Sequence, residues 1–111
     1  MSLTIKAIAS YKIIARLGTP APGARTNRFD IVLVDDQNTT IGVINFWKPD
    51  ELQDSYMGSN GYPEVHLEEH HYLSIVDLLR NEGPLWFNYD KEIKPLVARI
   101  VTTNEEVGGG E

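Results

Sequence analysis

Residues 72–89, YLSIVDLLRNEGPLWFNY, constrain the fold most, because they predict a helix, a stop and a strand in direct succession. At 100° per residue, the apolar side chains that share one sector of this helix are Ile75, Val76 and Leu79. Such a sector predicts a helix that is buried on one face. Gly83 is expected just past the helix C-cap, and Pro84 prevents the helix from continuing. No capping side chain marks the start, which we place within residues 68–71.

The segments before this helix have the patterns of strands. Residues 3–17 alternate with a period of two, which predicts one long strand, bent or bulged at Ala9 and Ser10 because these residues are small. Residues 29–34 and 40–47 are apolar and β-branched, and the turn-forming cluster between them predicts a hairpin in which Asn38 is left-handed.

The remaining segments predict a long loop and a second hairpin. Residues 48–63 are long for a connection, and we expect them to fold back on the domain or reach a partner, with one helical turn after Pro49. A short strand is expected at 64–67. Residues 85–89 and 93–102 are expected to pair around Asp90 and Lys91.

This order of elements predicts an α+β domain with five or six antiparallel strands and one amphipathic helix. Two architectures fit this order of elements, a small barrel of the OB type and an open sheet covered by the helix. With 111 residues and 41% hydrophobic content, the chain suits a single domain over residues 1–103. Residues 104–111 lack core-forming side chains and are expected to be a disordered acidic tail.

Composition limits the classes of function. The chain has no cysteine, no apolar run of about 18 residues and no secretory signal pattern, so we expect a cytoplasmic protein without disulfides or a membrane span. The net charge is −6, although residues 1–48 hold six basic and three acidic side chains and residues 49–111 hold four and thirteen. A basic footprint over the whole chain is therefore absent, which argues against nucleic-acid binding.

Three arginines around the loop at residues 18–27 are candidate ligand-binding residues: Arg16, Arg25 and Arg28. Such a cluster could hold a small anion or single-stranded nucleic acid. No glycine-rich phosphate motif accompanies these side chains, so a solvated basic loop explains them better.

The segment His66-Leu67-Glu68-Glu69-His70 matches the H-x-x-E-H pattern of some zinc hydrolases. That pattern needs both histidines one helical turn apart and a third protein ligand. His66 falls in the predicted strand, which destroys this spacing. We therefore expect no metal site, no cofactor and no catalytic residue, and disfavour a hydrolase that uses His66, Glu69 and His70.

Interaction with proteins is the function that the sequence favours, through a homodimer or another protein partner. Successive side chains of a strand point to opposite faces of the sheet. Of the two rings in Phe46-Trp47, and of the two in Trp86-Phe87, one is therefore expected in the core and the other at the surface or an interface. The long loop adds further apolar side chains. The candidate interface residues are Trp47, Tyr56, Met57 and Trp86.

Overall fold

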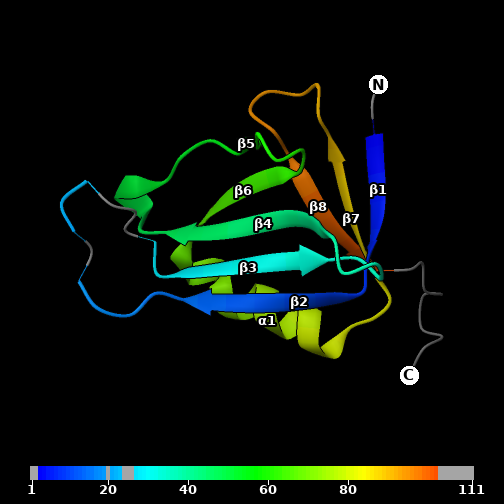
Figure 1. Ribbon diagram of the computed structural model, residues 1–111, viewed down its shortest axis with the longest axis horizontal. Coiled ribbons are helices and arrows are strands. Elements are labelled where there is room, and N and C mark those ends of the chain that lie inside the picture. The colour runs from blue at the N-terminus through cyan, green and yellow to red at the C-terminus, as the bar shows by residue number, and fades with distance from the viewer. Residues whose placement is uncertain (1–2, 20, 24–26, 103–111) are drawn as a thin grey trace.

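The computed structural model describes residues 3–19, 21–23 and 27–102, and it shows an α+β fold with eight strands in two open sheets and one short helix. One sheet has the order β1-β7-β8 and the other β2-β3-β4-β6-β5 (Figure 1). The strands are β1 Leu3–Ile8, β2 Ser10–Ala15, β3 Phe29–Val34, β4 Thr40–Trp47, β5 Tyr56–Met57, β6 Pro63–Glu68, β7 Leu85–Asp90 and β8 Ala98–Thr102.

The predicted long first strand is divided between the two sheets. β1 pairs with β7 and β2 pairs with β3, and the two halves run in clearly different directions (Figure 1). Ala9 N donates to Val34 O at 2.9 Å, while the next residue, Ser10, lies opposite Val34 in the strand register. Two residues opposite one form a β-bulge, which bends the strand. The predicted bend at Ala9 and Ser10 is confirmed.

The first predicted hairpin is also confirmed. β3 and β4 pair antiparallel, and the Oδ1 atom of Asp35 accepts bonds from the amides of Gln37 and Thr39 at 2.9 and 2.8 Å. These bonds hold the turn from its first residue. Asn38 has a φ of 62°, the left-handed conformation that its short polar side chain tolerates.

The long loop folds back onto the domain. It contains a short helical turn, η1 Pro49–Glu51, and then β5, before the chain enters β6. β6 pairs with β4 in parallel, so the prediction of a purely antiparallel fold is wrong at this pair. The crossover through residues 48–62 makes the parallel pairing sterically accessible, because it returns the chain to the end at which β4 begins.

The helix α1 Tyr72–Asn81 follows a short turn, η2 Glu69–His71. Val76 and Leu79 are buried, as predicted. The helix ends as expected: its C-cap is Glu82, so Gly83 is the residue just past the cap and Pro84 follows it, although the φ of Gly83 is not positive. The other core side chains come from both sheets and from the connection between β7 and β8: Ile31, Leu33, Ile41, Ile44, Phe46, Leu85, Phe87, Tyr89 and Leu96.

The second hairpin pairs β7 with β8, but β8 begins at Ala98 rather than at residue 93. Pro95 explains the late start, because it has no amide proton to donate to a strand ladder. Leu96 N instead donates to Ser55 O at 3.1 Å, across the seam between the two sheets. The described strands leave both sheets open along that seam, so the closed-barrel alternative is wrong and the open-sheet alternative holds.

Candidate functional site

Three polar side chains form a row across the centre of the five-stranded sheet. Asp30 lies opposite Asn45 in the register of β3 and β4, and Asn45 lies opposite His66 in the register of β4 and β6. All three are buried, although the neighbouring positions Ile31 and Ile44 point to the apolar core on the other face. Buried polar groups need hydrogen-bond partners, and they often mark functional sites.

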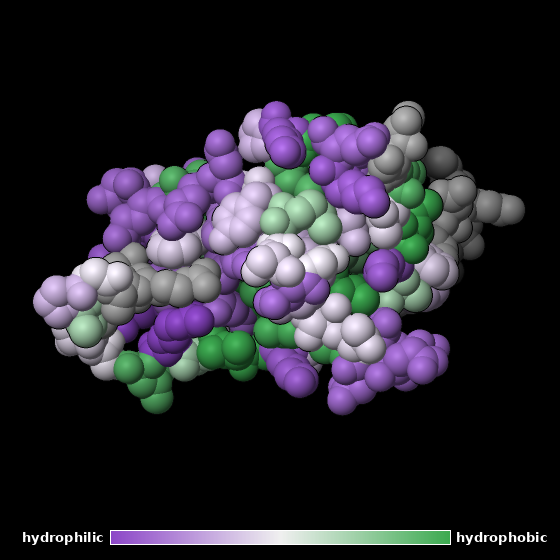
Figure 2. Space-filling model, turned by 45° about the horizontal axis from the view of Figure 1, so that its top comes forward, coloured by the Kyte–Doolittle hydropathy of each residue, from purple (hydrophilic) through white to green (hydrophobic). Residues whose placement is uncertain are grey.

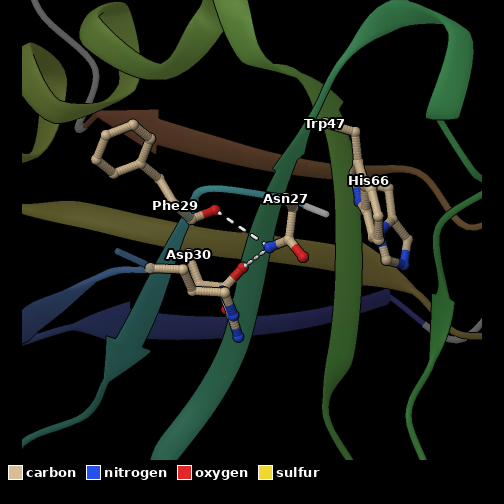
Figure 3. A network of polar contacts seen from close by, with 6 residues as sticks. Asn27, Phe29, Asp30, Trp47 and His66 are labelled. Carbon is tan, nitrogen blue, oxygen red and sulfur yellow. Dashed lines mark hydrogen bonds and ion pairs between the residues drawn. The ribbon is translucent and has the colours of Figure 1, made fainter. Parts of the chain in front are cut away.

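Asp30 is the anchor for one end of the row. Its Oδ2 atom lies 2.5 Å from Nη1 of Arg16. Its Oδ1 atom accepts a hydrogen bond from the side-chain amide of Asn27, and the same amide donates to the Phe29 carbonyl at 3.5 Å (Figure 3). The Arg16 charge is therefore neutralised by a buried carboxylate. This pairing gives Arg16 a structural role between β2 and β3.

The three candidate arginines do not meet as an anion site among the described residues. Arg28 is exposed and donates to the carbonyl of Gly18, across the loop. Arg25 lies outside the described residues. Because Arg16 is paired with Asp30, the arrangement gives little support to anion or nucleic-acid binding at this loop.

His66 is at the other end of the row, where it is hydrogen-bonded to Trp47. Nε1 of Trp47 donates a hydrogen bond to Nδ1 of His66 at 2.7 Å, and Figure 3 shows the two side chains together. The centroid of the Tyr56 ring lies 5.3 Å from that of the His66 ring. An Nδ1 atom that accepts a hydrogen bond carries no proton, so the imidazole bears its proton on Nε2. The ring is therefore placed as a neutral structural group between β4, β5 and β6.

Trp47 is 5% exposed, so the expectation that one ring of the Phe46-Trp47 pair stays at the surface is wrong. Trp47 is on the face opposite the core, where its ring centroid lies 5.7 Å from that of His66, and the His66 ring in turn lies beside Tyr56 of the folded-back loop. Trp86 is half-buried on β7. Tyr56 is exposed and Met57 half-buried, so both remain candidates for an interface.

The H-x-x-E-H segment is not on one helix. His66 is in β6 and buried, whereas Glu69 and His70 are exposed in η2. The two histidines therefore lack the one-turn spacing that the zinc pattern requires. No cluster of three metal-ligating side chains occurs within residues 3–19, 21–23 and 27–102.

The outer edge of β2 is a candidate surface that the sequence reasoning missed. β2 is the first strand of its sheet, and Arg16 N donates to Arg28 O at 2.7 Å as part of a directly opposed pair. In an antiparallel ladder, such pairs recur at every second residue. The even-numbered residues of β2 therefore point their amides at β3, and Tyr11, Ile13 and Ala15 point theirs at the open edge.

Apolar side chains accompany this open backbone. Ile13 is 40% and Ile14 44% exposed, one on each face of the strand, and Leu17 beyond the strand end is almost fully exposed. The adjacent isoleucines were the available signal in the sequence, because a half-buried strand should place a polar residue at one of the two positions. A long edge with exposed β-branched residues favours pairing with another strand. Figure 2 shows that apolar residues reach the surface in several groups between hydrophilic ones.

Comparisons with protein-family models, curated proteins and solved structures found no match to this chain. The described helix is too short to cross a membrane.

Proposed function

We propose that this protein is a non-enzymatic interaction module that associates as a homodimer through the outer edge of β2. The observation that carries the proposal is the combination, on one strand, of outward-pointing amides at Tyr11, Ile13 and Ala15 with exposed isoleucine side chains. A second copy is the occupant that we favour, because two identical edges present the same hydrogen-bond pattern to each other.

The pattern of outward amides restricts the register of such a pair. A two-fold axis at Ile13 places Ile13 opposite its symmetry mate and Tyr11 opposite the partner's Ala15. All six outward-pointing residues then meet as directly opposed pairs, which allows about six backbone hydrogen bonds. The two five-stranded sheets would become one continuous sheet through the dimer.

Side-chain contacts fit this register. On one face, the two Ile13 side chains meet at the axis, and on the other, Lys12 lies opposite the partner's Ile14. The aliphatic part of Lys12 can cover that isoleucine while its ammonium group stays in water. The contact is small compared with stable interfaces of about 1,600 Å², so we expect an affinity on the order of micromolar.

Light scattering over a concentration series tests the proposal. The wild-type mass should rise from 12.5 kDa towards twice that value with concentration. Ile13→Pro should stay monomeric, because proline removes an outward amide without removing a bond to β3. The matched control is Pro substitution at Val97, an exposed residue in the connection before β8, which should leave association unchanged. A wild-type mass that stays at 12.5 kDa up to millimolar concentration rejects the dimer.

A cytoplasmic location is part of this proposal, supported by the absence of cysteine. A further protein partner is compatible with it, because an edge strand can pair with another protein in the same way. No described arrangement favours a catalytic function: His66 is bonded to Trp47, Asp30 to Arg16 and Asn27, and Asp90 accepts from the amide of Glu92.

A further inference from the structure

A second surface feature is a cleft of about 650 Å³ at the seam between the two sheets. One wall is the segment around β5 and the other is the connection between β7 and β8. We call it the lysine cleft. The side chains that line it include Asp54, Tyr56, Met57, Lys91, Ile93 and Lys94.

Both walls are held in place by hydrogen bonds. Leu96 N donates to Ser55 O at 3.1 Å and so joins the walls, while the Ser55 hydroxyl accepts from His66 N at 2.9 Å. On the other wall, the Asp90 carboxylate accepts from the amide of Glu92 at 2.9 Å. A cleft built in this way needs little ordering when a ligand enters, which favours binding.

The lining combines apolar surface with positive charge. Tyr56 is 47% and Ile93 49% exposed, although both are large and mainly apolar side chains. Lys91 and Lys94 are exposed, and neither forms an ion pair with any residue of the described ranges. Residues 49–111 hold only four basic side chains, and two of them line this cleft. Within the described part of the chain, Asp54 is the only acidic side chain that lines it.

We infer that the lysine cleft binds an acidic peptide segment of a partner protein, with a large apolar side chain inserted between Tyr56 and Ile93. Carboxylates on either side of that side chain meet Lys91 and Lys94. The size of the cleft lies within the range of about 300–1,000 Å³ that is usual for ligand sites, enough for one or two side chains. The site is at the β5 end of the sheet, opposite the β2 edge, and does not depend on dimer formation.

A fluorescein-labelled, terminally blocked peptide Glu-Glu-Leu-Phe-Glu-Glu provides the probe. Its binding is measured by fluorescence anisotropy with the full chain, wild type and Ile13→Pro. We expect saturable binding on the order of 10–100 µM, since few contacts are made. The K91Q/K94Q double variant should bind about 5- to 20-fold more weakly, because two charge contacts are lost. Ile93→Ser should also weaken binding. Arg80→Gln, which removes one charge from the helix, should not change it.

Control ligands separate specific binding from charge attraction. A peptide with glutamine at every glutamate position and one with alanine at the leucine and phenylalanine positions should each bind at least about five-fold more weakly. The inference is overturned if the probe does not saturate up to millimolar protein, or if K91Q/K94Q binds as the wild type does. If Arg80→Gln weakens peptide binding as much as K91Q/K94Q does, the attraction is non-specific and the site is rejected. Competition by free phenylpropionate as strong as that by the unlabelled peptide would assign the cleft to small carboxylates instead.

Discussion

The two ends of the five-stranded sheet differ in length and in what they expose. β2, at one end, is six residues long and presents outward amides with Ile13 and Ile14. β5, at the other end, has two residues, because Met57 lies opposite Pro63, which has no amide proton, and a tight turn follows at Gly58. A long edge can bind through its backbone, whereas a short one leaves side chains to form a cleft.

The largest expected change in stability comes from proline substitution in β2, and its size should depend on whether the lost amide points at β3 or at the open edge. Ile14→Pro removes an amide that bonds to β3 and should lower the free energy of unfolding by about 3 kcal/mol or more. Ile13→Pro removes an outward amide and should cost less than about 1.5 kcal/mol, mainly from lost side-chain burial. Urea unfolding at dilute concentration, where the protein is monomeric, compares the two. Equal losses would mean that the assignment of inward and outward amides is wrong.

At the β5 end, the bond from Trp47 to His66 should support the fold. Trp47→Phe keeps an apolar ring but leaves the buried Nδ1 atom of His66 without this donor, so we expect a loss of about 1–3 kcal/mol. Trp86→Phe, at a half-buried position, is the matched control and should cost less. Thermal and urea unfolding measure both variants. A Trp47→Phe protein as stable as the control would show that the bond adds nothing.

Salt should affect the two ends in opposite ways. Pairing of two β2 edges brings Lys12 of both copies near each other, and each copy carries a net charge of −6, so added salt should strengthen the dimer, roughly two- to five-fold between 50 and 500 mM NaCl. Peptide binding at the lysine cleft should weaken over the same range. Sedimentation and anisotropy at both salt concentrations test this contrast. A dimer that weakens with salt would instead indicate contact between the basic and acidic halves of two chains.

The smallest expected effect is that of removing residues 104–111, which lie outside the described residues. Because they offer almost no apolar side chains to either end of the sheet, truncation after Thr103 should leave the melting temperature unchanged within error. Calorimetry of the truncated chain checks this, with its dimer affinity as a second readout. A fall of several degrees would show that the segment packs on the domain.

Local patterns in the sequence predicted the helix, both hairpins and the bulge at Ala9, since each depends on neighbouring residues. The parallel pairing of β4 with β6 and the burial of Trp47 could not be predicted, because both depend on where the long loop folds. The partner of Arg16 could not be predicted for a similar reason, because Asp30 lies across a strand pair from it. The adjacent isoleucines of β2 were visible, but their meaning required knowing that β2 is an edge.

Residue-resolved amide hydrogen exchange, followed by NMR at dilute and concentrated protein, tests the proposed pairing of β2 most directly. The amides of Tyr11, Ile13 and Ala15 should exchange fast in dilute protein and become protected as concentration rises, because they enter bonds with the partner strand. The amides of Lys12 and Ile14, which bond to β3, should be protected at both concentrations. If Tyr11, Ile13 and Ala15 exchange equally fast at both concentrations, β2 does not pair with a second copy.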